Sequence, residues 1–392
     1  MKIACVIHRY GPGATGGSEA HCRAIAERLA ARHDVTVVTS CATDYLTWKN
    51  VLPPGETREN GVRVVRVPVV RQRPLRDFWE MSDHVFNGRS SAEDQQTWFR
   101  LNGPEMPEAL DWLRRHGREY DRILFWSFRY YQSFFGVPLV ADRAILVPTA
   151  EADDLIRTAD VLRSFFLWPR GYVFLTPEEQ QLVAAYADGP LPPSIVIGSA
   201  LDPAPPVDAG VLTPLNLPMP FVLYLGRIER NKGCEALIEK FLAYDAARAS
   251  SGAPAISLVM AGPVFLPIPD HPRIRVLGFV EERVRDALLA TAQALIMPSP
   301  LESLSLVLLE AWNHGTPALV NGRCLPLKGQ TRRANGGLYY VQTAEFVEAL
   351  RVLASGPTLA RQFGAQGRAY VEREYRWPTV MDKLETFLAK TG

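Results

Sequence analysis

Short apolar runs and amphipathic stretches alternate along most of the chain. The run at residues 2–8 is short, rich in β-branched residues and typical of a buried strand. A predicted helix, 18–33, places three apolar residues on one face, namely Cys22, Ile25 and Leu29. Ser18 is its expected N-cap, and residues 34–40 form the next apolar strand. Strand, loop, helix and strand in this order predict a parallel α/β sheet.

The alternation of predicted strands and helices continues to about residue 200, is interrupted once, and then begins again. Further strands are predicted at 62–70, 120–128, 143–150, 171–177 and 194–199. We therefore predict a Rossmann-like domain over residues 1–200. A proline-rich stretch then excludes regular structure through most of its length, so residues 201–220 are expected to be a linker.

After the linker, a second set of strands is predicted at 221–228, 255–262, 274–280, 294–299 and 316–321, with helices at 234–247 and 281–292. A second Rossmann-like domain is expected over residues 221–375. The amphipathic tail, 376–392, is expected to be a helix that packs back on the N-terminal domain. Ligands of open α/β sheets bind outside the carboxyl ends of the strands, so a ligand cleft is expected between the two domains.

Composition narrows the class of protein. The chain has 392 residues and a formal net charge of +1, so no global field attracts nucleic acid. Five cysteines show no CxxC pairing, and no cluster has metal-ligand spacing, so no metal site is expected. No apolar run reaches the roughly 18 residues of a membrane helix. A cytoplasmic protein is expected, and the arginine- and aromatic-rich residues 70–86 leave a peripheral membrane contact open.

Two glutamates in "PSPLESLSLVLLEAWNHGTPAL", residues 298–319, are the first chemical signal. Glu302 follows a predicted strand, and Glu310 lies in an apolar helix expected to start at Ser303–Ser305. The free N–H groups at a helix N-terminus suit a phosphate. Eight helical residues rise about 12 Å, close to the length of a nucleotide. A nucleotide-sugar site explains both carboxylates, while a structural glutamate–arginine pair stays open for Glu310.

The second signal is "YLGRIERNKG", residues 224–233. Arg227 and Lys232 follow a strand and a glycine, in the turn before a helix. Arginine offers two N–H groups to a phosphate, and lysine adds a compact charge. Each residue alone fits solvated surface, but together they favour a diphosphate site in the same domain as the glutamates.

These two stretches resemble the retaining GT-B glycosyltransferases of family 4, whose pattern is G-R-x-x-x-x-K-G, then E-x7-E, then G-x-P-A/V. "GGSE" and the ending "EYRWPTVMDKLETFL" are similar to that family as well. The resemblance implies a GT-B fold that needs no permanently bound cofactor. It implies that the donor is a nucleoside-diphosphate sugar, with a UDP- or GDP-sugar favoured.

The resemblance also assigns roles to individual residues. It implies catalytic roles for Glu302, Arg227 and Lys232, with the two cations on the diphosphate and Glu302 at the donor sugar. It implies that Glu310 accepts hydrogen bonds from ribose. It implies backbone contacts to the donor from three segments, namely Gly16 and Gly17, Gly278 and Phe279 at the base, and Ser303, Leu304, Ser305 and Leu306 at the sugar and phosphate.

The N-terminal glycine loop also matches a rival motif. Gly11, Gly13 and Gly16 have the GxGxxG spacing of dinucleotide-binding proteins, which suggests an NAD-dependent dehydrogenase. That fingerprint expects an acidic residue at the end of the second strand. The second strand here ends "VVTSCAT", without one, so the dehydrogenase is disfavoured.

The acceptor side is less defined. The aromatic stretch 123–136 fits core packing, but Arg129 or Tyr130 could orient an acceptor. Similar glycosyltransferases often carry a histidine after "PTA", where Glu151 stands here, and Glu151 is a candidate acceptor base. His84 and His116 are alternatives, with neither favoured.

We therefore predict transfer of a sugar from a nucleoside-diphosphate sugar to an acceptor, with retention and without a metal. The acceptor could be a sugar, a lipid-linked glycan, a protein or a natural product. An epimerase of the same fold and a catalytically silent nucleotide-sugar-binding subunit stay open as alternatives.

Overall fold

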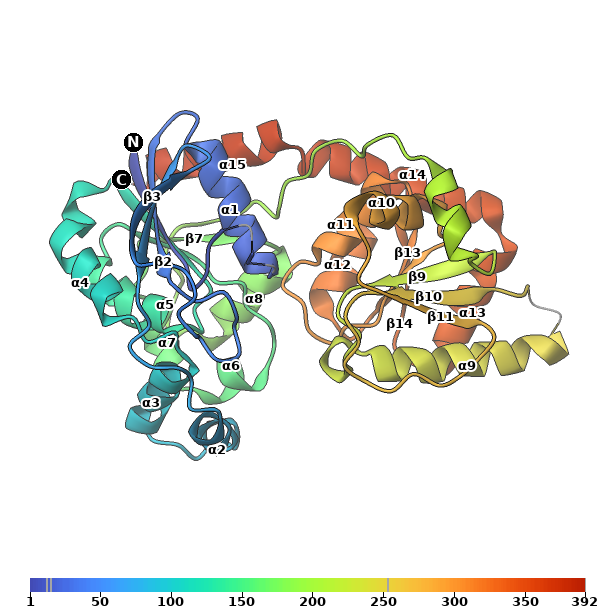
Figure 1. Ribbon diagram of the computed structural model, residues 1–392, viewed down its shortest axis with the longest axis horizontal. Helices are drawn as coiled ribbons and strands as arrows, with labels where there is room; N and C mark the ends of the chain where they lie inside the picture. Colours follow the sequence, from blue (N-terminus) through green and yellow to red (C-terminus); the bar gives the residue numbers. More distant parts are fainter. Residues whose placement is uncertain (12, 15, 252–253, 392) are drawn as a thin grey trace. The chain divides into compact units, whose positions relative to one another are not determined.

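A computed structural model describes residues 1–11, 13–14, 16–251 and 254–391. Two positions of the glycine-rich stretch, Pro12 and Thr15, lie outside the described residues. The chain divides into two compact units. Unit 1 comprises Met1–Gly198 and Met381–Gly392, and unit 2 comprises Ser199–Val380. Each unit is built around its own sheet with helices on both sides (Figure 1).

Unit 1 contains an eight-stranded sheet in the order β3-β4-β2-β1-β5-β6-β7-β8. Its strands are β1 Lys2–Val6, β2 Asp34–Ser40, β3 Gly55–Glu59, β4 Val62–Val67, β5 Arg122–Trp126, β6 Ala144–Val147, β7 Gly171–Phe174 and β8 Ser194–Val196. All neighbours pair in parallel except β3 and β4, which are antiparallel. The sequence pattern did not predict β3 because "GETRE" is polar and mostly exposed.

The helices of unit 1 are α1 Gly17–Leu29, α2 Leu75–Phe86, α3 Ala92–Asn102, α4 Pro107–His116, α5 Tyr131–Gly136, α6 Asp154–Thr158, α7 Val161–Phe165 and α8 Pro177–Tyr186, with 3-10 turns η1 Gly117–Glu119 and η2 Val137–Val140. α1 and α4 lie on opposite sides of the sheet (Figure 1). Ser18 is not the N-cap of α1. The helix begins one residue earlier, with Gly16 as N-cap, and the Ser18 hydroxyl donates to Glu19 instead.

Unit 2 contains a six-stranded parallel sheet in the order β11-β10-β9-β12-β13-β14. Its strands are β9 Phe221–Leu225, β10 Ser257–Ala261, β11 Ile274–Gly278, β12 Leu295–Met297, β13 Ala318–Asn321 and β14 Gly337–Tyr340. Its helices are α9 Cys234–Ser251, α10 Glu282–Thr291, α11 Leu306–Asn313, α12 Leu325–Ala334, α13 Thr343–Ser355 and α14 Pro357–Glu374, with 3-10 turns η3 Ala209–Leu215 and η4 Arg230–Lys232.

The two faces of the unit 2 sheet are covered by different helices. α9 and α10 lie on opposite sides of it (Figure 1). Phe241 of α9 and Phe346 of α13 are fully buried in one apolar cluster with the sheet. This cluster fixes the strand ends from which the loops of the donor-site candidates extend.

The last helix, α15 Trp377–Lys390, carries the chain from unit 2 into unit 1. Its C-terminal part is tied to the unit 1 sheet by two arginines. Arg122 Nε donates to the carbonyl of Leu388 (2.9 Å), and Arg170 Nε donates to that of Thr391 (3.2 Å). The predicted fold class, two parallel α/β domains, is confirmed. In the part of the chain that the structure describes, no helix is both long and apolar enough to cross a membrane.

Candidate functional site

The loop after β9 carries two of the predicted donor residues, Arg227 and Lys232. Gly233 ends this loop with φ +75°, a conformation that favours glycine. A Cβ on Gly233 would lie 2.4 Å from the carbonyl oxygen of Pro298, which follows β12. The glycine therefore allows the loop after β9 to approach the loop after β12, where Glu302 lies.

This approach brings Lys232 and Glu302 together. Lys232 Nζ lies 2.8 Å from Glu302 Oε1, and the side chains are 28% and 14% exposed. Arg227 is 43% exposed and forms an ion pair with Glu229 at 3.1 Å. Three predicted donor residues thus come from two adjacent strand ends and place cationic groups beside a carboxylate.

The N-terminus of α11 lies next in the chain. Ser305 is its N-cap, and the serine hydroxyl accepts from Leu308 N at 3.3 Å. Ser305 has φ +79°, which is unfavourable for a residue with a side chain. The preceding residue, Leu304, is held in place because its side chain is buried and its carbonyl accepts a hydrogen bond from Gln330 Nε2. The strained turn therefore has a defined geometry at the helix N-terminus, where N–H groups lack helical partners.

Glu310 is the fifth residue of α11, and its side chain is partly buried. Its side chain is 20% exposed, and its Oε2 forms an ion pair with Arg285 of α10. Glu310 is therefore only partly buried in its apolar helix, and the arginine partner that the sequence left open is present. The described residues give Oε1 of Glu310 no hydrogen bond or ion pair, because Arg285 pairs with Oε2, so one carboxylate oxygen can still accept from a ligand.

Gly278 is the last residue of β11 in the same sheet, and Phe279 follows it. Gly278 has φ +67°, and its carbonyl accepts from Gly262 N at 2.7 Å. The Phe279 ring is 83% exposed. The structure thus places a flat apolar group at a strand end, which fits contact with a nucleobase.

In unit 1, Gly16 and Gly17 were predicted to approach the donor, and Gly16 lies against the side chain of Glu19. A Cβ on Gly16 would lie 2.1 Å from Glu19 Oε2, whereas one on Gly17 would meet nothing within 4 Å. Glu19 is 4% exposed and accepts from His8 Nε2 at 2.9 Å and from Arg9. This buried cluster was not predicted, although the acidic residue of "GGSE", a few residues after "HRY", was a signal for it.

The charges of this cluster compensate one another. Burial alone would raise the pKa of Glu19, but the charge and hydrogen bond of His8, followed by the charge of Arg9, hold it well below the usual range. Glu19 is therefore ionised at neutral pH. It fixes the residues that follow β1 against the start of α1.

Arg129 and Tyr130 follow β5 at the carboxyl edge of the same sheet. Arg129 forms an ion pair with Asp153. The Tyr130 ring packs against the His8 ring at a tilt of 33°, with centroids 3.9 Å apart. Burial raises the pKa of the Tyr130 phenol, so it stays protonated. The structure therefore joins Tyr130, but not Arg129, directly to the His8–Glu19 cluster.

Glu151 follows β6 and is partly exposed. The residue before it, Ala150, donates its N–H to Glu179 at 2.7 Å. Glu179 is fully buried on α8, three residues after the N-cap Thr176. It was not predicted, although the T-x-x-E spacing of "TPEE" was a signal for a glutamate at the start of a helix. This buried acid positions the segment that carries Glu151.

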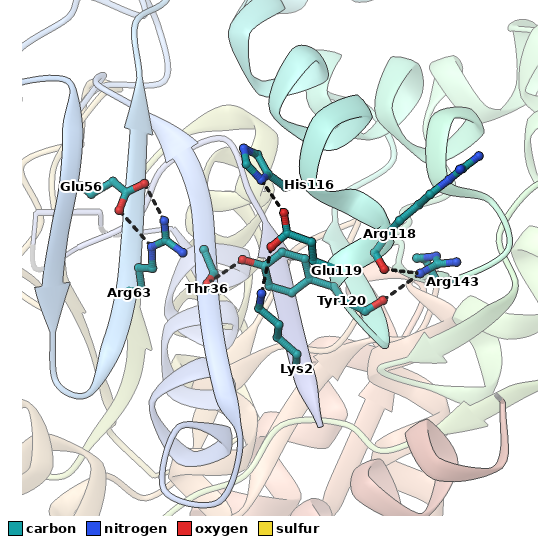
Figure 2. Close-up of polar contacts among 9 residues, drawn as sticks. All are labelled: Lys2, Thr36, Glu56, Arg63, His116, Arg118, Glu119, Tyr120 and Arg143. Carbon is teal, nitrogen blue, oxygen red and sulfur yellow. Dashed lines mark hydrogen bonds and ion pairs between the residues drawn. The ribbon is translucent and has the colours of Figure 1, made fainter.

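The two alternative histidines lie elsewhere. His116 bonds the exposed Glu119, which also binds Lys2 at the amino end of β1 (Figure 2). This is the sheet edge opposite to the carboxyl strand ends. His84 on α2 bonds Asp94 of α3 and is exposed. In the described part of the chain, no group of three or more His, Cys, Asp or Glu residues could hold a metal ion.

Comparison with known proteins supports the fold and relates residues 219–355 to a known family. Residues 219–355 match the family model described as "Glycosyl transferases group 1". No curated protein sequence matches the chain. Three solved structures with low sequence identity are similar over nearly the whole of both chains.

Sucrose-phosphate synthase from Thermosynechococcus elongatus is 19% identical, with a TM-score of 0.73 and coverage of 100% of both chains. Anabaena Alr3699/HepE in complex with UDP and glucose is 13% identical, with a TM-score of 0.67 and full coverage of both. WaaG, a glycosyltransferase involved in lipopolysaccharide biosynthesis, is 15% identical, with a TM-score of 0.64 and coverage of 98% and 99%.

The predicted GT-B fold is thereby confirmed, and the domain that carries the donor-site candidates matches a glycosyltransferase family model. The chain has the GT-B fold, and its residues 219–355 match the family model of the group 1 glycosyl transferases.

Proposed function

We propose that this protein transfers a sugar from a nucleoside-diphosphate sugar to an acceptor, with retention of anomeric configuration. The observation that carries the proposal is the Lys232–Glu302 pair at 2.8 Å, beside Arg227 and the N-terminus of α11. Cations and helix N–H groups at one sheet edge suit a diphosphate leaving group. The HepE complexes contain UDP and UDP-glucose, which makes UDP the first nucleotide to test.

Each donor-site residue has a role in this proposal. Arg227 and Lys232 stabilise the charge that develops on the departing diphosphate. Glu302 orients Lys232 and accepts from a hydroxyl of the donor sugar. Glu310 accepts from the ribose through Oε1 while Arg285 holds Oε2. Backbone groups at Ser303–Leu306 and Gly278–Phe279 contact the sugar phosphate and the base.

Gly16 and Gly17 start α1 near Glu19, and we assign them to close approach by substrate from unit 1. Arg129, Tyr130 and Glu151 are the corresponding acceptor-side candidates. With these charges in place, the proposed reaction needs no metal ion.

Binding of diphosphates to the full-length protein tests the donor site. Thermal unfolding should be measured with UDP, GDP, ADP, TDP and NAD, for the wild type and for the double variant Arg227→Met/Lys232→Met. A ligand at 100 times its Kd adds about 2.7 kcal/mol to stability. We expect one diphosphate to stabilise the wild type and to lose this effect in the double variant.

Arg230→Met is the matched control, because Arg230 is an exposed arginine of the same loop that pairs with Glu235. It should bind the diphosphate like the wild type. Stabilisation by NAD alone would refute the donor site in favour of a dinucleotide enzyme. Acceptor-dependent release of the diphosphate then separates transfer from epimerisation and from silent binding.

A further inference from the structure

Arg73 is a partly buried arginine of unit 1 that the donor site leaves unexplained. It follows β4 at the carboxyl edge of the sheet, and its backbone N–H donates to Thr47 O at 2.8 Å. Its Nε and Nη2 donate to the backbone carbonyl of Asn102 at 3.0 and 2.6 Å, and Nη2 also donates to Asn102 Oδ1 at 3.0 Å. Its guanidinium is thus held in one orientation.

No carboxylate pairs with Arg73 within the described residues, and its Nη1 makes no hydrogen bond there. Burial lowers the pKa of Arg73 to about 10, so it still carries its charge at neutral pH. Other arginines at this sheet edge are compensated, since Arg9 pairs with Glu19 and Arg129 with Asp153. A partly buried guanidinium that has a fixed orientation and no carboxylate partner is suited to bind an anion from solution.

Asn102 ties the surroundings of Arg73 together. Its carbonyl also accepts from Trp48 Nε1 at 2.6 Å, and its Nδ2 donates to the carbonyl of Arg129 at 2.7 Å. Asn102 therefore links the loops that follow β2, β4 and β5. Through Asn102, Arg73 is therefore connected to Arg129, the residue that precedes Tyr130.

Aromatic rings complete the surroundings. The Arg73 guanidinium lies 5.0 Å from the Trp48 ring centroid, and Tyr130 meets the same ring edge-on at 5.7 Å. His8, packed against Tyr130, is 1% exposed, and its Nδ1 has no hydrogen-bond partner among the described residues. A buried ring nitrogen without a partner is a second polar group suited to a ligand.

We propose that Arg73, with the Tyr130 hydroxyl, binds a phosphate group of the acceptor, so that the substrate class is a phosphorylated one. This inference rests on the proposed function, which requires an acceptor. The Nη1 group supplies two N–H donors to phosphate oxygens, and the phenol supplies an O–H donor. The partly exposed Tyr130 ring offers apolar surface to the carbon skeleton, while the buried Trp48 ring supports both Tyr130 and the guanidinium.

Inorganic phosphate is the probe for this site, used on the full-length protein saturated with UDP. Its Kd is measured by thermal unfolding at constant ionic strength in the wild type, Arg73→Met, Tyr130→Phe and Arg76→Met. Arg76 is a nearby exposed arginine that pairs with Glu80, so it serves as the control. We expect saturable binding that weakens at least about tenfold in Arg73→Met and about threefold in Tyr130→Phe, and stays unchanged in Arg76→Met.

Tyr130→Phe keeps the ring contacts, so it tests the site even if Arg73→Met fails to fold. Absence of saturable phosphate binding in the wild type, or an unchanged Kd in Tyr130→Phe and Arg73→Met, overturns the proposal. Failure of UDP to bind is a separate result that counts against the donor site. In that case, phosphate is titrated into Arg227→Met/Lys232→Met, which lacks the donor cations and should retain the Arg73 site.

A transfer screen with acceptor pairs that differ only by a phosphate separates an acceptor group from free phosphate. If the phosphate belongs to the acceptor, only the phosphorylated member reacts, and Arg73→Met raises its KM more than it lowers kcat. Equal reaction of both members contradicts the proposal.

Discussion

Glu179 makes stability depend on pH in a direction that can be calculated. Its carboxyl group is fully buried on α8 and accepts from the N–H groups of Ala150 (2.7 Å) and Leu175 (2.6 Å). Burial raises its pKa from 4.5 to about 8, against the opposing effect of these hydrogen bonds. The group is therefore protonated in the folded protein at pH 7 and ionised in the unfolded chain.

A folded pKa above the unfolded value means that the folded state binds the extra proton. The stability contributed by this proton is fully present below pH 4.5 and is lost as pH rises to about 8. A shift of about 3.5 pH units corresponds to about 5 kcal/mol, with a slope of about 1.4 kcal/mol per pH unit within that window. Above pH 8 both states are ionised, and this contribution becomes constant.

Glu179→Gln removes the titration and keeps the shape of the side chain. At pH 5 the variant should be less stable than the wild type by about 1–3 kcal/mol, because its amide N–H₂ faces one of the two N–H donors. Denaturant unfolding of both proteins from pH 5 to 9 should show this deficit shrink and then reverse. Glu178→Gln, at a partly exposed site, is the control and should follow the wild type. Parallel curves for Glu179→Gln and the wild type would refute the reasoning.

Two further substitutions test the donor side. Glu310→Ala should raise the Kd of the bound diphosphate about tenfold while the protein stays folded, as measured by calorimetry; the exposed Glu281→Ala is its control, and an unchanged Kd contradicts the ribose role. Gly233→Ala should lower the free energy of unfolding by about 2 kcal/mol or more, because its Cβ would meet Pro298 O at φ +75°. Gly17→Ala, whose Cβ has open space, should be nearly neutral, and a similar loss in both would exclude the steric cause.

The parts of the fold that could be predicted are those with a local signal. Apolar strands such as 221–225 and 257–261 are continuous runs, and the helix of unit 1 that carries Cys22, Ile25 and Leu29 has the expected buried face. The polar strand β3 could not be predicted, because its stability comes from pairing with β4 rather than from its own side chains. Ser18 was predicted as the N-cap, but Gly16 takes that position because it has no Cβ to meet the Glu19 carboxylate, and the Ser18 hydroxyl donates to Glu19 instead.

In the candidate site, too, residues with a local sequence signal could be predicted and long-range contacts could not. Arg227, Lys232 and Glu302 were predicted from their positions after strands, and the structure places two of them in contact. Arg285 could not be predicted as the partner of Glu310, because the sequences of the two helices do not indicate which of their residues come into contact. Arg73 and Asn102 are 29 residues apart in the sequence, and neither belongs to a motif. Long-range polar contacts therefore depend on the three-dimensional structure for their discovery.

The Lys232–Glu302 pair has a consequence for how a diphosphate would bind. Without an anion, Glu302 compensates the charge of Lys232 in a partly buried position, which limits the cost of burying either group. An ammonium group has three N–H donors, so Lys232 can bind phosphate while one donor stays on Glu302. The carboxylate then lies next to the diphosphate and repels it, unless a sugar hydroxyl donates to the carboxylate. This arrangement favours an intact nucleotide sugar over the bare diphosphate, because only the former supplies the hydroxyl.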